Sequence, residues 1–134
     1  MDSIELHNRV KNLKLFRGIY PRNELYNIKY LNGYIVVNTN DSSEPGEHWV
    51  AIYFTPQKGE YFDPFGLPPL HSDFVNFLNK KCSRWCYNNK TIQDPLSKKC
   101  GKYCIAFLLS KLKNVSFIKF LQMFKSFRYN EIYS

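Results

Sequence analysis

The sequence lacks several features that define large classes of proteins. It contains no apolar run long enough to cross a bilayer, and residues 1–5 have neither a basic region nor an apolar segment. It has no internal repeat, no low-complexity stretch and no linker between domains. With 44% apolar residues among 134, the chain is too hydrophobic for an extended disordered protein. We therefore predict a single domain over residues 1–134, without a secretory signal and without a membrane-spanning segment.

Acidic residues are scarce in the later part of the chain. Residues 1–79 contain seven Lys or Arg and nine Asp or Glu, whereas residues 80–134 contain twelve and two. The net charge of +8 therefore belongs to the carboxyl-terminal part. This asymmetry favours a polyanionic partner, with nucleic acid first and an anionic membrane surface second. The alternative is a solvated, lysine-rich surface that has no partner.

Cysteine is also infrequent, with four residues at positions 82, 86, 100 and 104. In a chain without a secretory signal, such thiols indicate metal ligands, a nucleophile or core packing more often than disulfides. The repeated C-x3-C spacing suggests zinc, but zinc sites usually place their cysteines on tight turns. Cys100 and Cys104 instead begin a strongly helical pattern, so we expect no metal site.

The order of hydrophobic patterns predicts an α+β fold in which helices flank a small mixed or antiparallel sheet. Strands are expected over 33–38 and in a hairpin of 48–54 with 60–62, and another strand is possible within 84–92. Helices are expected over 3–15, 72–81, 100–112 and after 116, with cap candidates at Ser3, Ser72 or Asp73, Ser97 and Ser116. Residues 17–21 are predicted to end the first helix, 41–46 to form a loop, and 63–69 to be irregular because of their prolines. The inward residues of the first helix would be Ile4, Leu6, Val10 and Leu13.

Two residues have the local context of a catalytic pair. Cys100 lies at the start of a predicted helix, where the helix dipole and the preceding Lys98 and Lys99 favour a thiolate. Of the three histidines, only His48 opens a predicted strand directly after a loop, which is a position from which a rigid scaffold can present a functional group. A structural histidine remains the alternative for such a position.

The wider pattern resembles the adenovirus-type cysteine proteases (adenain), which belong with the proteases of ubiquitin-like modifiers. The resemblance runs from about residue 13 to 110 and rests on four motifs. They are Phe16-Arg17-Gly18-Ile19-Tyr20 with Val37-Asn38-Thr39, Glu47-His48-Trp49-Val50-Ala51-Ile52, Tyr61-Phe62-Asp63-Pro64-Phe65-Gly66, and Gln93-x6-Cys100-Gly101-x2-Cys104. It implies a papain-like arrangement with the nucleophile at the amino terminus of a central helix.

The resemblance also implies a role for each matching residue. Cys100 would be the nucleophile, His48 the general base and acid, and Asp63 the partner of the other imidazole nitrogen. Gln93 would donate its side-chain amide to the oxyanion together with the backbone N–H of Cys100. Trp49 would shield the thiolate and imidazole from water. Adenovirus proteases usually carry Glu where Asp63 stands, although other members of the wider group use Asp.

The resemblance further implies partners and a location. Substrates would be viral structural precursors cut at Gly-containing sites, and the source would be an adenovirus-like virus, a Maverick-type transposable element or a related mobile element. The enzyme would act as a monomer inside the virion or the host cell, in the nucleus or cytoplasm, without a cofactor for the chemistry. DNA and an activating peptide are possible activators in this family. Cys82 has a spacing from Cys100 like that of the cysteine that bonds the activating peptide, but Cys86 is a rival, and a buried or free thiol is the alternative for both.

Three classes of function therefore remain open. The order of His48, Asp63, Gln93 and Cys100 favours a maturation endopeptidase. A deconjugating or deubiquitinating protease would use the same chemistry on an isopeptide bond. A non-catalytic nucleic-acid-binding module would explain the basic carboxyl-terminal part alone.

Overall fold

A computed structural model describes residues 3–40, 48–89 and 100–123 of the chain. Its helices are α1 (Ser3–Val10), η1 (Arg22–Asn27, a 3-10 helix), α2 (Ser72–Lys81) and α3 (Cys100–Leu112), and residues 117–123 are also helical. Its strands are β1 (Phe16–Pro21), β2 (Gly33–Asn38), β3 (Trp49–Phe54), β4 (Gly59–Phe62) and β5 (Trp85–Tyr87). The predicted loop at 41–46 and the cap at Ser97 lie outside the described residues.

The five strands form one mixed sheet in the order β1-β2-β3-β4-β5. The predicted hairpin is confirmed, because β3 and β4 pair antiparallel with Ala51 opposite Phe62. Strand β2 also runs antiparallel to β3, while the two outer pairs, β1 with β2 and β4 with β5, are parallel. The sheet is therefore antiparallel at its centre, and each edge strand is joined to its parallel neighbour by a crossover, through η1 between β1 and β2 and through α2 between β4 and β5.

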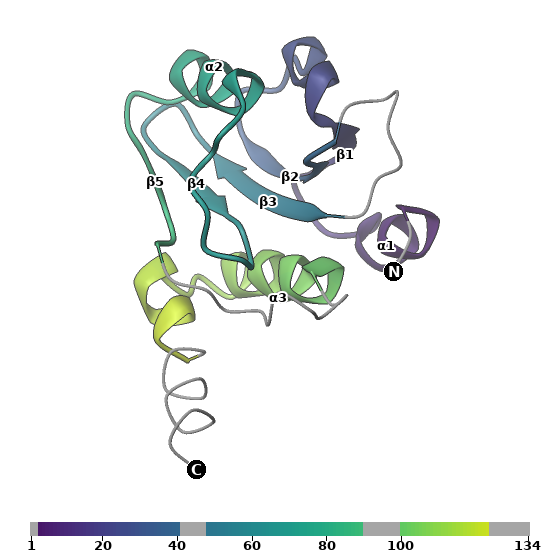
Figure 1. The fold of residues 1–134 in the computed structure, drawn as a ribbon. Coiled ribbons are helices and arrows are strands. Elements are labelled where there is room, and N and C mark those ends of the chain that lie inside the picture. The colour runs from purple at the N-terminus through teal and green to yellow at the C-terminus, as the bar shows by residue number, and fades with distance from the viewer. Residues whose placement is uncertain (1–2, 41–47, 90–99, 124–134) are drawn as a thin grey trace.

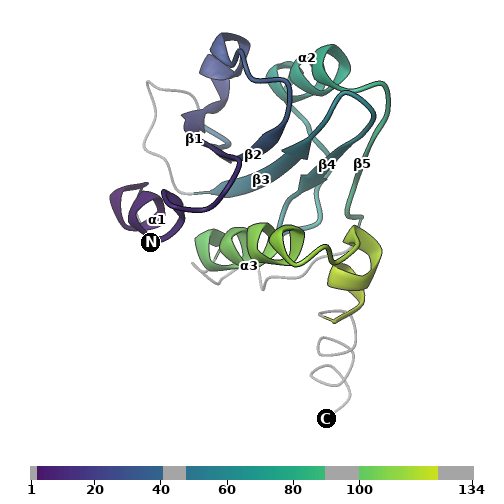
Figure 2. The same cartoon turned by 180° about the vertical axis from the view of Figure 1, so that it is seen from behind.

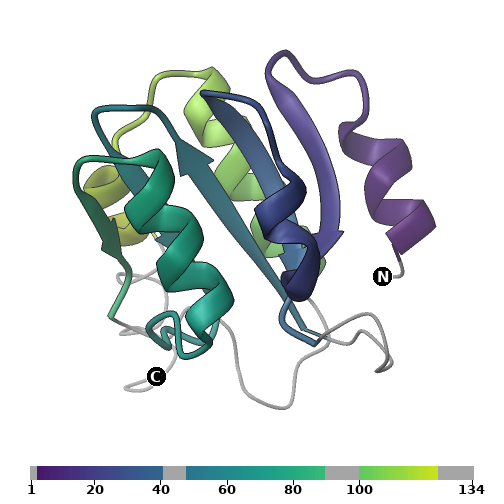
Figure 3. The same cartoon turned by 90° about the horizontal axis from the view of Figure 1, so that it is seen from above.

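Helices cover both faces of the sheet (Figure 1). Helices α1 and α3 lie side by side on one face (Figure 2), and η1 and α2 lie on the other (Figure 3). The alternation within β2 explains this: Tyr34 and Val36 face α1 and α3, whereas Ile35 and Val37 face η1 and α2. Because both faces of the sheet are buried, the central strands have continuous apolar sequences. This is why residues 33–38 could be predicted as a strand.

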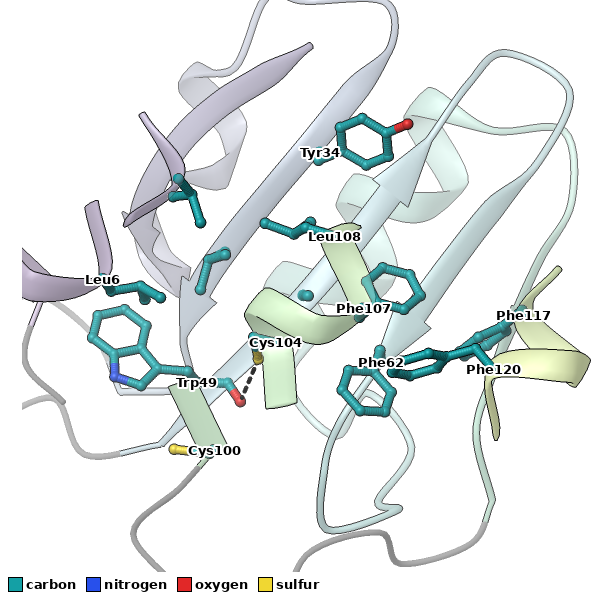
Figure 4. Packing of buried hydrophobic residues seen from close by; sticks show 13 residues of the cluster. Leu6, Tyr34, Trp49, Phe62, Cys100, Cys104, Phe107, Leu108, Phe117 and Phe120 are labelled. Carbon is teal, nitrogen blue, oxygen red and sulfur yellow. Dashed lines mark hydrogen bonds between the residues drawn. The ribbon is translucent and has the colours of Figure 1, made fainter. Parts of the chain in front are cut away.

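Phe62 of β4 packs on the face of the sheet that carries α3 (Figure 4). Its ring stacks on Phe107 with centroids 5.3 Å apart and meets Phe120 edge-on at the same distance. Phe120 follows Ser116, whose hydroxyl accepts a hydrogen bond from the Lys119 amide at 3.2 Å, so the predicted cap at Ser116 is confirmed. This packing fixes β4 against α3, next to the point where β4 ends.

The amino-terminal part differs from the sequence prediction. Helix α1 ends at Val10 instead of continuing to residue 15, and Leu6 and Val10 are buried whereas Ile4 is 72% exposed. The segment 17–21, predicted only as a break, belongs to the edge strand β1. Its glycine explains the error, since Gly18 has a φ of 122° and lies where the register with β2 shifts. A bulged strand with Gly and Pro has the composition of a turn.

Helix α2 has the predicted range but not the predicted cap. Its N-cap is His71, and no side chain makes a capping hydrogen bond there. The Asp73 carboxylate instead pairs with the guanidinium of Arg22 at 2.7 Å, which joins α2 to η1. The inward stripe is confirmed, because Phe74, Phe77 and Leu78 are buried. In the described residues, no helix combines the length and hydrophobicity that a bilayer crossing requires.

Candidate active site

The central hairpin brings His48 and Asp63 together. His48 immediately precedes β3 and Asp63 immediately follows β4, so antiparallel pairing places both at the same end of the sheet. His48 Nε2 lies 2.8 Å from Asp63 Oδ1, and the Asp63 side chain is only 4% exposed. Because a carboxylate only accepts, the ring nitrogen is the donor. The other ring nitrogen, Nδ1, is also buried.

The turn after β4 orients this pair. The Asp63 carboxylate accepts a second hydrogen bond, from the Phe65 amide at 2.8 Å, and its backbone carbonyl accepts from the Gly66 amide at 2.8 Å. Asp at the first position and Pro64 at the second suit such a turn, and Gly66 has a φ of 74°, which glycine adopts without strain. The segment from Asp63 to Gly66 is thus a single unit that holds a carboxylate and an aromatic ring.

Phe65 is the ring that covers His48. The two rings stack with centroids 4.3 Å apart and an interplanar angle of 16°. The turn from Asp63 to Gly66 follows β4 directly, so it brings Phe65 to the end of the sheet where His48 precedes β3. Trp49, to which the resemblance assigns a shielding role, is 4% exposed and lies in the same buried cluster as Cys100 (Figure 4).

Cys100 occupies the first described position of α3 and is 4% exposed. Burial alone would raise the pKa of its thiol, but four contacts outweigh burial and lower this pKa. They are a hydrogen bond with His48, the backbone amide of Trp49, the charge of His48 and the backbone amide of Gly101. Backbone amides directed at a sulfur stabilise its thiolate form. Helix α3 packs on β3, which holds this thiol beside the end of the sheet where His48 lies.

The pKa of the His48 imidazole is shifted in the opposite direction to that of the Cys100 thiol. Burial lowers the pKa of His48, but the hydrogen bonds and charges of Asp63 and Cys100 outweigh burial and raise it to about 9. Because Asp63 takes Nε2, the interaction with Cys100 falls to Nδ1. A lowered thiol pKa beside a raised imidazole pKa describes a thiolate–imidazolium pair at neutral pH. The structure thus brings three of the four predicted site residues together, and Gln93 lies outside the described residues.

The other three cysteines lack this environment. All four cysteines are free thiols, and burial raises the pKa of Cys82, Cys86 and Cys104. Cys82 is buried beside Gly59, where an added Cβ would lie 2.7 Å from its sulfur, whereas Cys86 is exposed on β5. Within residues 3–40, 48–89 and 100–123, no three His, Cys, Asp or Glu side chains gather closely enough to hold a metal ion.

Sequence reasoning missed one polar residue at this site. Asn88 follows β5, is 1% exposed, and hydrogen-bonds both polar backbone groups of Asp63. Its only signal in the sequence is an asparagine directly after a short strand candidate. That signal is typical of a turn, so it does not distinguish a buried contact from an exposed one.

The fold and the meeting of a thiol, an imidazole and a carboxylate define a papain-like arrangement. The chain is 34% identical over 95 residues to the protease of bovine adenovirus C serotype 10, an alignment that covers 60% of this chain and 48% of the relative. It is 26% identical over 89 residues to the protease of porcine adenovirus A serotype 3, covering 54% of this chain and 44% of the relative. The resemblance to adenovirus-type proteases is therefore confirmed. The chain spans about half the length of the curated relatives it matches.

Solved structures confirm the fold. The selenomethionine form of the ASFV pS273R protease matches with a TM-score of 0.54 and 24% identity, over 65% of this chain and 37% of that one. Another crystal structure of the ASFV pS273R protease matches with a TM-score of 0.52 and 22% identity, over 69% of this chain and 38% of that one. No family model matches the sequence. At these identities the structures support the α+β fold prediction and nothing finer.

Proposed function

We propose that the chain is a cysteine endopeptidase that cleaves viral or mobile-element structural precursors during particle maturation. The observation that carries this proposal is the His48–Asp63 hydrogen bond beside a Cys100 thiol of lowered pKa. The adenovirus relatives, which are named proteases, support the reaction class. The precursor substrates, and action within the virion or host cell, are part of the same proposal.

The residues divide the reaction between them. The Cys100 thiolate attacks the carbonyl carbon of a peptide bond, and the carbonyl oxygen becomes an oxyanion. The backbone N–H of Cys100 and the side-chain amide of Gln93 donate to that oxyanion. When the C–N bond breaks, His48 Nδ1 gives its proton to the leaving amine, and a thioester on Cys100 remains.

Water then completes the cycle. His48 accepts a proton from a water molecule, whose oxygen attacks the thioester carbonyl, and the thiolate leaves as the carboxylic acid product forms. Asp63 keeps Nε2 protonated throughout, so that Nδ1 is the nitrogen that exchanges protons. Phe65 limits the access of water to one face of the ring. This chemistry uses no metal or cofactor.

A peptide-library cleavage profile tests the proposal. The protein and its Cys100→Ala variant are incubated with the library, with and without DNA, and with a ubiquitin-like protein joined through its carboxyl terminus to a peptide amine. Cleavage next to glycine by the wild type, absent in Cys100→Ala, supports a maturation endopeptidase. Preferential cleavage of the conjugate identifies a deconjugating enzyme instead. The absence of cleavage in all of these arms would refute the proposed protease function.

A further inference from the structure

The backbone of Asp63 is held by a side chain from the edge of the sheet. Asn88 Oδ1 accepts a hydrogen bond from the Asp63 N–H at 2.9 Å, and Asn88 Nδ2 donates to the Asp63 carbonyl at 2.7 Å. One side-chain amide thus pairs with both polar backbone groups of one residue, as the backbone of a neighbouring strand would. Asn88 is 1% exposed, so it cannot touch a substrate.

This contact begins where the pairing of strands ends. Strands β4 and β5 run parallel as far as Tyr61 opposite Tyr87, and one more step brings Phe62 level with Asn88. The ladder cannot continue through Pro64, which has no N–H. Without Asn88 the buried Asp63 N–H would lose this acceptor, and leaving such a group unpaired is costly, whereas the carbonyl would keep its hydrogen bond from the Gly66 amide. The Asn88 side-chain amide therefore takes the place of the next backbone hydrogen bonds that a longer β5 would make with the chain after β4.

The same contact determines where the carboxylate points. Asp63 Oδ1 is shared between His48 Nε2 and the Phe65 amide, both at 2.8 Å. An aspartate side chain has two rotatable bonds, so a fixed N–H and carbonyl set the direction of its Cα–Cβ bond and limit the positions its oxygens reach. A small rotation of the Asp63 backbone would move Oδ1 out of hydrogen-bond distance of the imidazole.

We propose that Asn88 is a positioning residue, which fixes the Asp63 backbone so that the carboxylate remains hydrogen-bonded to His48. Its effect on catalysis rests on the proposed protease function, whereas its effect on the His48–Asp63 pair does not. Asn88 holds both polar backbone groups of Asp63, and Asp63 and Cys100 are the groups whose hydrogen bonds and charges raise the pKa of the imidazole. Removal of Asn88 therefore changes the rate of chemistry and the titration of His48, and it leaves substrate binding unchanged.

The test compares three variants. Asn88→Leu has the same branching and the same number of side-chain heavy atoms but makes neither hydrogen bond, and Asn88→Ala removes both hydrogen bonds without adding bulk or charge. Leu78→Ala is the control, because Leu78 is fully buried in α2 on the opposite face of the sheet and its loss destabilises the fold without touching Asp63. For each variant, kcat and KM are measured on a cleaved peptide, and the His48 ring is titrated by NMR at a temperature where every protein is folded.

We expect Asn88→Leu to lower kcat by about 10- to 100-fold with KM unchanged, as misplaced catalytic groups do. The His48 pKa should fall below its wild-type value in both Asn88→Leu and Asn88→Ala and stay unchanged in Leu78→Ala. If Asn88→Leu does not fold, Asn88→Ala carries the same comparison.

A purely structural role gives a different result. The proposal is overturned if the Asn88 variants lose thermal stability but keep the wild-type kcat and His48 pKa, as the control does. If the wild-type protein cleaves no peptide, the proposed function fails, and the His48 titration alone then decides the role of Asn88.

Discussion

The Cys104 thiol donates a hydrogen bond to the backbone carbonyl of Trp49, 3.5 Å away (Figure 4). The backbone amide of the same Trp49 hydrogen-bonds the sulfur of Cys100, one helical turn earlier. Two thiols on one face of α3 thus contact one residue of β3 in opposite roles, Cys104 as a donor and Cys100 as an acceptor. Burial, followed by the charges of Cys100 and Asp63, raises the pKa of Cys104 well above its usual value. Cys104 therefore stays a neutral thiol that joins α3 to β3.

This contrast predicts which cysteine reacts first. Cys100 should be alkylated by iodoacetamide fastest at neutral pH, because thiolate is the reactive form and only the Cys100 pKa is lowered among the four cysteines. Mass-spectrometric mapping of a short labelling pulse measures the order. Cys86 is the internal control, since it is exposed but has a raised pKa. If Cys86 is labelled before Cys100, exposure dominates and the assignment of the nucleophile is wrong.

The raised His48 pKa predicts the alkaline limit of activity. The imidazolium persists until the pH passes its pKa of about 9, so kcat/KM should decline above that pH, where His48 loses the proton it gives to the leaving amine. The lowered Cys100 pKa places the acid limit below the usual range of a thiol. Asp63→Asn should move the alkaline limb to lower pH, because the hydrogen bond and charge of Asp63 help to raise the His48 pKa.

Asp73→Asn is the matched control for this shift. It removes a carboxylate that pairs with Arg22 at 2.7 Å, on the opposite face of the sheet from α3. Its pH profile should match that of the wild type. An alkaline limb that is the same in Asp63→Asn and Asp73→Asn would contradict the assigned role of Asp63.

Much of this site could be predicted because its parts are local in sequence. The Asp63-Pro64-Phe65-Gly66 motif encodes its own turn, and the continuous apolar run of 49–54 places His48 at a strand end. The Asn88 contact could not be predicted, since Asn88 and Asp63 are 25 residues apart and meet only because β5 pairs parallel with β4. The strand β1 was missed for a related reason. Its pairing with β2 stabilises a segment whose Gly18 and Pro21 alone favour a turn.

The site residues should differ in the cost of their removal. His48→Ala should reduce turnover about as severely as Cys100→Ala, because the members of a triad act as a unit. Asp63→Asn should be milder than either, since the thiolate and imidazolium also stabilise each other. Single-turnover rates on one cleaved peptide measure the order. If Asp63→Asn is as damaging as Cys100→Ala, the carboxylate does more than orient the ring.

Gln93→Ala tests how much the Gln93 side-chain amide stabilises the oxyanion. We expect a loss of about 10²- to 10³-fold in kcat, the usual effect of removing one oxyanion donor. The thiol of Cys100 should keep its wild-type alkylation rate, because Gln93 is assigned to the substrate oxygen and not to the nucleophile. A Gln93→Ala variant with wild-type kcat would show that another donor serves the oxyanion.

The basic carboxyl-terminal part predicts DNA binding that does not depend on sequence and weakens steeply with salt. Lys102, Lys113 and Lys119 are exposed, so they can neutralise phosphates and release counterions. Lys111 cannot serve in this way, because its side chain is 7% exposed and pairs with Glu60 at 2.5 Å. Lys102→Gln, Lys113→Gln and Lys119→Gln together should flatten the slope of log K against log salt by about 0.9 for each phosphate that the protein no longer neutralises.

Lys111→Gln separates DNA binding from stability. It leaves the buried Glu60 carboxylate with Lys58 at 3.8 Å but without the closer Lys111, so it should lower the melting temperature while the salt slope stays that of the wild type. The triple variant should show the opposite, with normal stability and unchanged peptide hydrolysis in the absence of DNA. Fluorescence anisotropy with two unrelated duplexes across a salt series measures both slopes. No binding at low salt would leave the lysines as a solvated surface, and tight binding to one duplex alone would contradict recognition through phosphates, because a backbone contact carries no sequence information.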